Sequence, residues 1–369
     1  MTPTPLTMGV IGTAHKANER RAPIAPEHFE RISPELRERI FVESGYGERF
    51  GVADDVLARH VAGMRSREAL FAECDIVLLP KPTEPDFGDF RPGQIIWGWP
   101  HCVQGRAITQ VGIDKRLTYI AWEAMNLWRN GVWDMHVFAR NNELAGYASL
   151  VHAVSLAGFT GLYGPRKRVA VIGFGSTGRG AVHALEGLGF HDITVFIPHD
   201  DRRVPHSRPG IDYRAFDHQT DMASELANYD IIMNCILQDP ERPFVYVDEA
   251  RIGDLRDGTL IIDVSCDAGM GFSFARPTGF DAPMFTVDGR IMYYAVDHSP
   301  SYLWRSATWE ISSALLPYIP VVMAGAAAWA ENETIQRAIE IRDGEILNPQ
   351  ILSFQKRSPD YPHAPLAGS

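Results

Sequence analysis

The sequence predicts an α/β fold of two domains, each built around a parallel β-sheet, and three observations support this. Short apolar runs of strand length alternate with helical stretches along most of the chain, as in parallel sheets that carry helices on both faces. The length of 369 residues is sufficient for two domains. Between two alternating regions, residues 145–162 carry mostly Ala, Gly, Leu and Val without charge, which indicates a buried helix.

The first alternating region lies before this uncharged segment. Its expected strands are short apolar runs, at 8–12, 40–43, 76–79, 95–99 and 119–122. Helical stretches at 26–39 and 67–73 lie between them. After the uncharged segment, further apolar runs of strand length predict a second sheet, with strands at 168–172, 193–197, 231–235 and 260–264.

The chain becomes helical again near its C-terminal end, with expected helices at 304–316 and 324–342. The last twenty or so residues are rich in proline and are expected to form an extended tail. We therefore expect one domain to comprise residues 1–145 and 301–369. A second domain, residues 146–300, is inserted between them, and a cleft separates the two.

The composition argues against several classes of partner. The formal net charge of −11 disfavours nucleic acid and anionic membranes, because both need clustered Lys and Arg. The sequence shows no basic and apolar leader, and its most apolar stretch, residues 314–330, is interrupted by Pro317 and Pro320. We therefore expect a cytoplasmic protein that does not enter a membrane.

The cysteines and histidines are scattered along the chain. The four cysteines form no CxxC pair and are expected to be reduced thiols, at positions 74, 102, 235 and 266. The histidines show no metal-ligand spacing, so no metal site is expected.

A glycine-rich loop begins the second region. Gly173, Gly175 and Gly178 directly follow the expected strand at 168–172, and apolar residues at helical spacing follow them. Such a loop provides a tight turn and a close approach of backbone to a pyrophosphate, and the helix N-terminus offers free N–H groups. This context predicts a dinucleotide-binding Rossmann domain, with Ser176 and Thr177 also at the cofactor.

Cofactor preference depends on the residues after the next strand, at 193–197. Dinucleotide-binding domains that select NAD place an acidic residue there. In this chain His199 occupies about that position, and Arg202 follows, which favours NADP. Asp200 could still serve NAD, and a solvated charged turn remains an alternative. We also expect Cys235, at the end of a later strand of this domain, to contact the cofactor.

Three polar side chains follow strands of the first domain. Arg21, in a pair of adjacent arginines, suits bidentate carboxylate binding. Lys81 lies between two prolines at a strand end, and a partly desolvated lysine can act as acid or base. His101 follows an aromatic segment and can titrate near neutral pH. A surface salt bridge, a solvated lysine and a structural histidine are the respective alternatives.

Asp297 ends the second region and precedes Arg305. An acid at this junction is expected to face the cleft between the domains, where ligands usually bind. Cys102, beside His101, is expected to be structural because no partner group is apparent.

Together these segments resemble the family that contains alanine dehydrogenase, saccharopine dehydrogenase and N5-(carboxyethyl)ornithine synthase, with the greatest likeness to the last of these. The motifs that carry the resemblance run in the same order over residues 8–325, and are KANERRAPIAP, WGWPHC, YDIIMNCI, GTLIIDVSCDAG, FDAPMF and DHSPSYLWRSAT. The resemblance implies two Rossmann-like domains, a nicotinamide cofactor and a homodimer. The apolar segment 321–330 is a candidate dimer surface.

The resemblance also implies roles for single residues. Arg21 matches an arginine that binds a substrate carboxylate, and Arg305 is expected to assist it. Lys81 and His101 match an acid–base pair. Glu123 matches an acidic residue on the amino-acid side of the pocket. In the second domain, Asp297 matches an aspartate close to the nicotinamide and the substrate.

The sequence departs from the family pattern in three places. Pro82 stands where the saccharopine enzymes carry glutamate, which puts recognition of a diamine in doubt. The segment 127–140 and the tail beyond Gln350 have no clear counterpart.

The expected reaction is the NAD(P)H-dependent condensation of an amino acid with a 2-oxo acid, through an imine that is reduced to a secondary amine. Oxidative deamination by a simple amino-acid dehydrogenase is the first alternative. A non-catalytic dinucleotide-binding protein is the second, and an S-adenosylmethionine-dependent methyltransferase is a third. Neither of the last two accounts for Arg21, Lys81 and His101 together.

Overall fold

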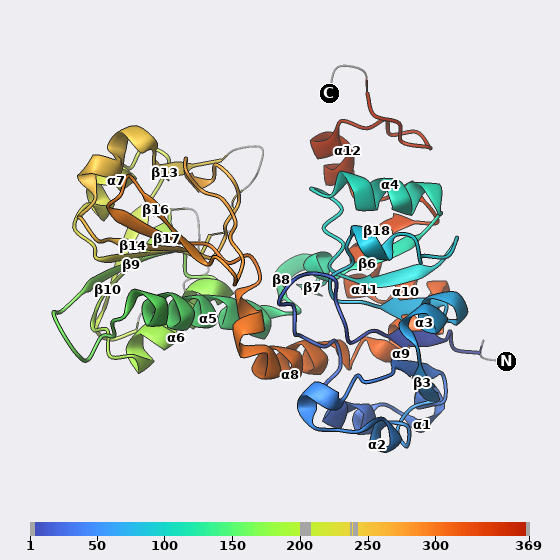
Figure 1. The fold of residues 1–369 in the computed structure, drawn as a ribbon. Coiled ribbons are helices and arrows are strands. Elements are labelled where there is room, and N and C mark those ends of the chain that lie inside the picture. The colour runs from blue at the N-terminus through green and yellow to red at the C-terminus, as the bar shows by residue number, and fades with distance from the viewer. Residues whose placement is uncertain (1–3, 200–207, 237, 239–242, 367–369) are drawn as a thin grey trace. The chain divides into compact units, whose positions relative to one another are not determined.

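The computed structural model describes residues 4–199, 208–236, 238 and 243–366. It divides into two compact units (Figure 1). Unit 1 comprises Met1–Phe138 and Trp304–Ser369, and unit 2 comprises Ala139–Leu303. The borders predicted from the sequence follow residues 145 and 300. Among the described residues no helix is long and apolar enough to span a bilayer.

Unit 1 is built on an eight-stranded sheet with the order β19-β18-β6-β5-β4-β1-β2-β3. All its strand pairs are parallel except those that β18 makes with β6 and β19. The strands are β1 (Met8–Val10), β2 (Ile40–Glu43), β3 (Gly63–Arg65), β4 (Ile76–Leu78), β5 (Ile95–Gly98), β6 (Thr118–Ala121), β18 (Ile339–Arg342) and β19 (Glu345–Ile346).

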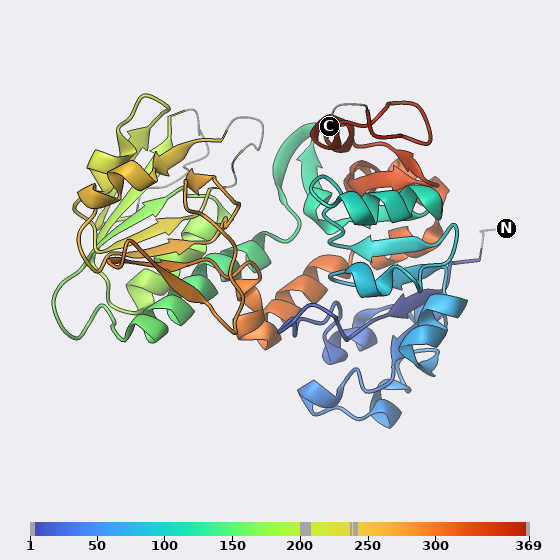
Figure 2. The same ribbon diagram turned by 45° about the horizontal axis from the view of Figure 1, so that its top comes forward.

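Helices cover this sheet, and a hairpin of β7 (Asn126–Arg129) and β8 (Val132–His136) extends from it. Helix α4 packs on one face (Figure 2), where Ile108 and Ile113 share a buried cluster with Val77. The α-helices are α1 (Pro34–Arg37), α2 (Asp54–Leu57), α3 (Arg67–Glu73), α4 (Arg106–Asp114), α8 (Trp304–Leu315), α9 (Ile319–Ala324), α10 (Ala326–Glu331), α11 (Glu333–Ala338) and α12 (Pro349–Gln355). The 3₁₀ helices are η1 (Pro26–Arg31), η2 (Glu48–Phe50), η3 (Glu84–Asp86) and η4 (Trp122–Ala124).

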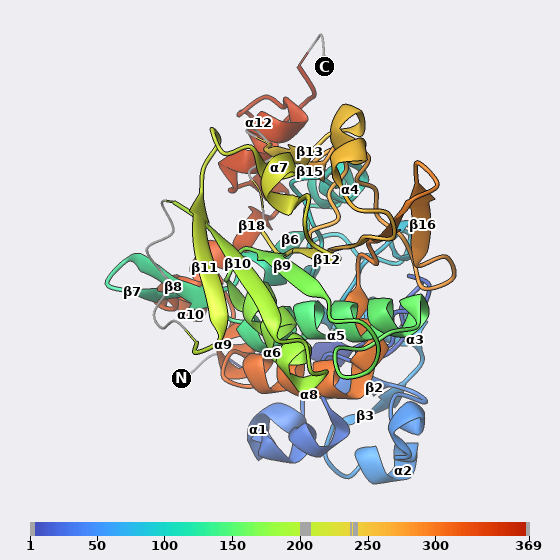
Figure 3. The same cartoon turned by 90° about the vertical axis from the view of Figure 1, so that its left-hand side faces the viewer.

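Unit 2 is built on a seven-stranded sheet with the order β11-β10-β9-β12-β14-β17-β16, in which only β16 is antiparallel to its neighbour. Figure 3 shows β11, β10, β9 and β12 side by side in this order. The strands are β9 (Arg168–Ile172), β10 (Asp192–Pro198), β11 (Ile211–Phe216), β12 (Ile231–Asn234), β14 (Leu260–Asp263), β16 (Met284–Val287) and β17 (Ile291–Tyr294), with a small separate pair of β13 (Val245–Val247) and β15 (Gly271–Phe272). The helices are α5 (Ala139–Ala157), α6 (Ser176–Gly187), α7 (Met222–Leu226), η5 (Glu249–Asp254) and η6 (Ser299–Leu303).

This architecture confirms the predicted α/β fold with mostly parallel sheets. The apolar runs form strands because both faces of each sheet are buried. Successive residues of a strand therefore belong to hydrophobic clusters on opposite faces of the sheet. In β4, for example, Ile76 and Leu78 join one buried cluster and Val77 joins another.

The expected helix at 324–342 is wrong. The chain there forms two short helices, α10 and α11, and then the strand β18. The side chain of Asn332 accepts a hydrogen bond from the backbone N–H of Ile335 at 3.0 Å, and this N-cap starts a new helix. The β-branched residues Ile339 and Ile341 then pair with β6.

Three other expected elements differ from the structure. The stretch 26–39 is divided into η1 and α1, because Pro34 restricts the preceding residue to an extended conformation. The uncharged helix is α5, which begins at Ala139 and ends before Gly158, where φ is +77°. The proline-rich tail contains helix α12, with Pro349 in its first turn.

Part of the expected dimer surface at 321–330 is buried within unit 1. Val322, Met323 and Trp329 are at most 4% exposed and belong to its core. The exposed residues of this segment are alanines, at 324, 326, 327 and 330, so the apolar surface that remains there is made mainly of small side chains.

Helices α5 and α6 cross in close contact because glycines lie at the crossing point. A Cβ atom on Gly180 would lie 1.7 Å from the carbonyl oxygen of Glu143, and one on Gly146 would lie 2.0 Å from that of Thr177. We therefore expect Gly180→Ala to lower the free energy of unfolding by about 2–3 kcal/mol, measured by urea denaturation. Gly187→Ala in the same helix, where a Cβ meets nothing within 4 Å, is the control and should be neutral or stabilising. Equal stability of the two variants would contradict this account.

Candidate active site

The sheet of unit 1 brings four predicted site residues to one edge. Strands β6, β5, β4 and β1 are consecutive and parallel, so their carboxyl ends meet at the same edge, where α/β sheets bind ligands. The residues that follow these four strands are Glu123, His101, Lys81 and Arg21. Parallel topology therefore places residues far apart in sequence at neighbouring strand ends.

Lys81 and His101 lie side by side. The distance from Lys81 Nζ to His101 Nε2 is 3.5 Å. The backbone N–H of Trp99 donates to the carbonyl oxygen of Pro80 at 2.9 Å, which ties the two strand ends together. His101 also has a positive φ of 51°, a conformation that is uncommon for residues other than glycine and is found at functional sites.

Glu123 contacts the same histidine from η4. Its Oε1 atom accepts the backbone N–H of His101 at 2.6 Å and lies 3.7 Å from His101 Nδ1. Its Oε2 atom is buried, and no described residue hydrogen-bonds to it. Burial and the nearby carboxyl of Glu340 raise the pKa of Glu123 to about 8. The group is therefore able to carry a proton at neutral pH.

The β7–β8 hairpin, whose segment has no clear family counterpart in the sequence analysis, also reaches this site. His136 Nε2 lies 3.2 Å from the backbone oxygen of Glu123, and His136 Nδ1 accepts the N–H of Phe138 at 3.1 Å. Burial lowers the pKa of His136. The hairpin thus supports the loop that carries Glu123.

Arg21 is buried and held in a defined orientation. Its Nε and Nη2 atoms donate to the two carboxylate oxygens of Glu19 at 2.8 and 2.5 Å. The guanidinium lies 5.0 Å from the centre of the Trp99 ring, which in turn packs against Trp122. Arg21 is 5% exposed. Arg21 and Glu19 therefore form an interior ion pair beside an aromatic wall. The sequence had left a surface salt bridge as the alternative for Arg21.

The remaining two predicted polar residues lie elsewhere. Arg305 is exposed on α8, where it donates to the backbone oxygen of Arg49 at 3.3 Å. Asp297 belongs to unit 2, and its Oδ1 atom lies 2.5 Å from His298 Nδ1.

The glycine loop of unit 2 fits a dinucleotide. Gly173 has a φ of +92°, and a Cβ atom on Gly178 would lie 2.1 Å from the carbonyl oxygen of Gly173, so both positions require glycine. Gly175 is exposed at the N-cap of α6, and a Cβ there would meet nothing within 4 Å. The loop therefore leaves open space beside the N-terminus of a twelve-residue helix, where phosphates bind.

Three other predicted cofactor residues surround this loop. Ser176 and Thr177 are partly exposed in the first turn of α6. Cys235 is buried, and its Cβ lies 3.7 Å from the position that a Cβ on Gly178 would take. Burial raises the pKa of its thiol, so the thiol is neutral at physiological pH.

The residues expected to select the cofactor follow β10. The backbone N–H of His199 donates to the carbonyl oxygen of Phe216 at 2.8 Å, and its side chain is exposed. Arg202 and Asp200 lie outside the described residues. The structure therefore places His199 at a strand end and leaves the choice between NAD and NADP untested.

A buried carboxyl cluster in unit 2 was missed by sequence reasoning. Asp263, at the end of β14, accepts hydrogen bonds from Asn234 Nδ2, the Cys266 N–H and the Tyr293 hydroxyl. Burial raises the pKa of Asp263 to about 6, and burial also raises that of Asp267, four residues later. Polar residues directly after the apolar runs at 231–233 and 260–262 were the available signal.

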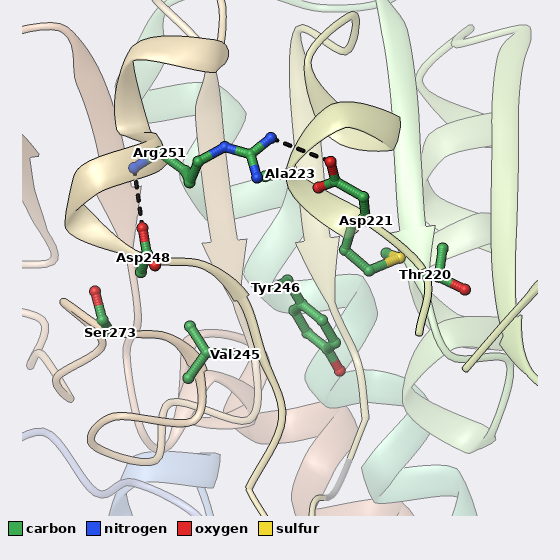
Figure 4. A pocket seen from close by; sticks show the side chains of 9 residues that line it. Thr220, Asp221, Ala223, Val245, Tyr246, Asp248, Arg251 and Ser273 are labelled. Atoms are coloured by element: carbon green, nitrogen blue, oxygen red, sulfur yellow. Dashed lines mark hydrogen bonds and ion pairs between the residues drawn. The ribbon is translucent and has the colours of Figure 1, made fainter. Parts of the chain in front are cut away.

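A pocket in unit 2 is separate from all these residues (Figure 4). It lies between α7, β13 and η5, where Arg251 pairs with Asp221 at 3.3 Å. None of the predicted site residues lines it, so we assign it no role in the site. Its lining residues are Thr220, Asp221, Met222, Ala223, Val245, Tyr246, Asp248, Arg251 and Ser273.

Comparison with known proteins identifies the family to which this chain is similar. Residues 11–145 match the alanine dehydrogenase/PNT N-terminal domain, and residues 149–349 match the C-terminal domain. The N(5)-(carboxyethyl)ornithine synthase of Clostridium botulinum is 30% identical over 313 residues, which cover 82% of this chain and 90% of the relative. The alanine dehydrogenase of Mycolicibacterium smegmatis is 24% identical over 359 residues, which cover 92% of this chain and 95% of the relative.

A solved structure of an L-alanine dehydrogenase shares the fold, with a TM-score of 0.79 at 19% identity over 95% of this chain and 99% of that one. The resemblance inferred from the sequence motifs is thereby confirmed. The chain belongs to the alanine dehydrogenase/PNT family, a family of Rossmann-type NAD(P)-linked oxidoreductases of amino-acid metabolism.

Proposed function

We propose that this protein catalyses the reversible, NAD(P)H-dependent condensation of an amino acid with a 2-oxo acid. The observation that carries the proposal is the contact between Lys81 and His101, with Glu123 beside them, at the carboxyl edge of the unit 1 sheet. A relative whose name fits such a condensation, an N(5)-(carboxyethyl)ornithine synthase, is 30% identical to this chain and supports the proposal.

The residues of unit 1 divide the work of binding and proton transfer. Arg21, oriented by Glu19, would hold a substrate carboxylate, with Arg305 as a second candidate. The substrate amine adds to the oxo-acid carbonyl, and Lys81 and His101 would move the protons as the carbinolamine forms and loses water. The resulting imine gains a hydride and a proton and becomes a secondary amine.

The residues of unit 2 would hold the cofactor. The loop from Gly173 to Gly178 and the N-terminus of α6 would bind its pyrophosphate, and Cys235 would contact it. The bound nicotinamide would supply or accept the hydride. Asp297 is the proposed polar neighbour of the reacting groups from this unit.

A simple amino-acid dehydrogenase is the second candidate. It is favoured by the match to an alanine dehydrogenase over 92% of the chain. The same Lys81–His101 pair would serve it, with water attacking the imine to release ammonia. A non-catalytic dinucleotide-binding role is disfavoured because it gives no reason for a lysine and a histidine in contact.

The deciding experiment measures oxidation of NADPH and NADH with pyruvate or 2-oxoglutarate, against a panel of amino acids and ammonia. Oxidation that requires both an oxo acid and a particular amino acid would support the condensation. Oxidation with ammonia in place of the amino acid would establish the dehydrogenase. No oxidation of a cofactor that binds would overturn the proposal for these substrates.

We also propose NADP as the preferred cofactor and a homodimer as the working form. NADP rests on His199 in place of an acid after β10, and the dimer rests on the family resemblance alone. Light scattering after gel filtration measures the second, and a monomer would contradict it.

Replacing His199 with aspartate is expected to shift the ratio of kcat/KM for NADPH and NADH toward NADH by about tenfold or more, because a carboxylate accepts the ribose hydroxyl and repels a phosphate. Steady-state kinetics with both cofactors measures this ratio. His191→Asp, at an exposed position before the opposite end of β10, is the control. An unchanged ratio in His199→Asp would remove this residue from cofactor selection.

A further inference from the structure

The tail beyond Gln350, which has no clear counterpart in the family pattern, contacts the loop that carries His101. This His101 loop comprises residues 99–105, between β5 and α4. Helix α12 ends at Gln355, which is 1% exposed. The Nε2 atom of Gln355 donates to the backbone oxygen of Cys102 at 2.6 Å. This bond joins the tail to the residue that directly follows His101 in the chain.

The orientation of the Gln355 amide is determined by its two partners. Arg357 Nε donates to Gln355 Oε1 at 2.7 Å, and an arginine side chain has no atom that accepts a hydrogen bond. The backbone oxygen of Cys102, on the other side, is unable to donate one. The amide nitrogen therefore faces Cys102, and the amide oxygen faces Arg357.

Arg357 and His363 attach the tail to the rest of unit 1. Arg357 is 6% exposed, and its Nη1 atom donates to Gln110 Oε1, on α4, at 2.8 Å and to the backbone oxygen of His363 at 3.1 Å. His363 Nε2 accepts the backbone N–H of Ile346, on β19, at 3.0 Å. The tail is thus bonded to a helix and to a strand of unit 1, which hold the glutamine amide in place.

The backbone on both sides of His101 is hydrogen-bonded to other segments. The N–H of His101 donates to Glu123 Oε1 at 2.6 Å. The carbonyl oxygen of Cys102 accepts both the Gln355 amide and, at 2.9 Å, the Thr109 hydroxyl. These bonds hold the turn in which His101 has a φ of +51°. The His101 side chain is 48% exposed, so its position depends on this backbone more than on packing.

We propose that Gln355 is a positioning residue that keeps the His101 imidazole beside Lys81. It acts by fixing the Cys102 peptide, so that the turn presents the imidazole 3.5 Å from Lys81 Nζ. A displacement of about 1 Å between reacting groups lowers a rate by about 100-fold, so a fixed loop has a large effect. The role in catalysis rests on the proposed function, whereas the position of His101 is measurable without a substrate.

The test is Gln355→Met, which replaces the amide by an apolar side chain of similar length. Gln94→Met is the matched control, because Gln94 is also 1% exposed and its Nε2 donates to two backbone oxygens, both at 2.9 Å. Gln94 directly precedes β5, whereas His101 lies beyond the other end of that strand. Both variants lose buried hydrogen bonds and should be destabilised to a similar extent.

Two measurements report on His101. In proton–carbon NMR spectra, the imidazole signals that His101→Asn removes are expected to move or split in Gln355→Met and to stay unchanged in Gln94→Met. With the substrates found by the panel assay, Gln355→Met should lower kcat by about tenfold or more and leave KM and NADPH affinity within about threefold. Gln94→Met should keep the kcat of wild type.

Unchanged imidazole signals in Gln355→Met, equal changes in the two variants, or a displaced imidazole with the kcat of wild type would overturn the proposal. If Gln355→Met does not fold, Gln355→Asn replaces it, with Gln94→Asn as control. Asparagine retains the amide but is one methylene shorter, so it should not reach Cys102. A displaced imidazole in a protein whose wild type is inactive in the panel assay would overturn the proposed function alone.

Discussion

Replacing Lys81 with methionine, or His101 with asparagine, is expected to lower kcat by about 10²–10⁴-fold, because each change removes one member of the proton-transfer pair. Methionine keeps an unbranched side chain that is one atom shorter than that of lysine, and it has no titratable group. Asparagine adopts the positive φ that His101 has, so the backbone of the loop is preserved. Steady-state kinetics with NADPH and the substrates found by the panel assay measures the loss.

Two further measurements separate a chemical defect from a structural one. Thermal unfolding and cofactor binding should match those of wild type, because both residues lie in unit 1 and the cofactor loop lies in unit 2. His60→Asn is a matched control, since His60 contacts Glu30 at 3.4 Å in unit 1 but belongs to no predicted site. Activity within about threefold of wild type in both variants would exclude Lys81 and His101 from catalysis.

Replacing Gly175 with valine is expected to weaken NADPH binding by about 100-fold, or about 2.8 kcal/mol, without affecting the fold. The backbone at Gly175 is extended, with φ −69° and ψ −163°, which valine adopts readily. A Cβ there contacts no protein atom within 4 Å, so the added methyl groups occupy only the space assigned to the pyrophosphate. Isothermal titration calorimetry measures the affinity.

The comparison with Gly178→Val makes this prediction specific. A Cβ at Gly178 would lie 2.1 Å from the carbonyl oxygen of Gly173, so valine there should lower both cofactor affinity and thermal stability. Gly175→Val should lower only the affinity. Wild-type NADPH affinity in Gly175→Val would show that the cofactor does not occupy this loop.

The strands were more predictable than the helices. Apolar runs such as 76–79 and 260–264 are sufficient because both faces of each sheet are buried. Helix bounds depend on capping and on single prolines, and the Asn332 cap interrupts what the sequence analysis expected to be one helix. The strand β18 has only four residues, and such a short run does not distinguish a strand from a helix by periodicity.

The residues of the candidate site could be predicted where they directly follow a recognisable strand. Lys81 and His101 each follow a clear apolar strand, and parallel topology then brings them within 3.5 Å of each other. Glu340 carried no such signal, because it lies in the segment expected to be helical. Strand β18, which carries Glu340, pairs with β6 more than 200 positions earlier in the chain, and a single sequence does not reveal such a pairing.

The division of unit 1 between two ends of the chain has a consequence for biosynthesis. Unit 2 is continuous, so all its strands have been made once the ribosome has translated Leu303. Unit 1 then still lacks β18, and the β6 edge stays unpaired until the last segment emerges. A chain that is released after residue 303 should therefore contain a protease-resistant unit 2 and a protease-sensitive unit 1.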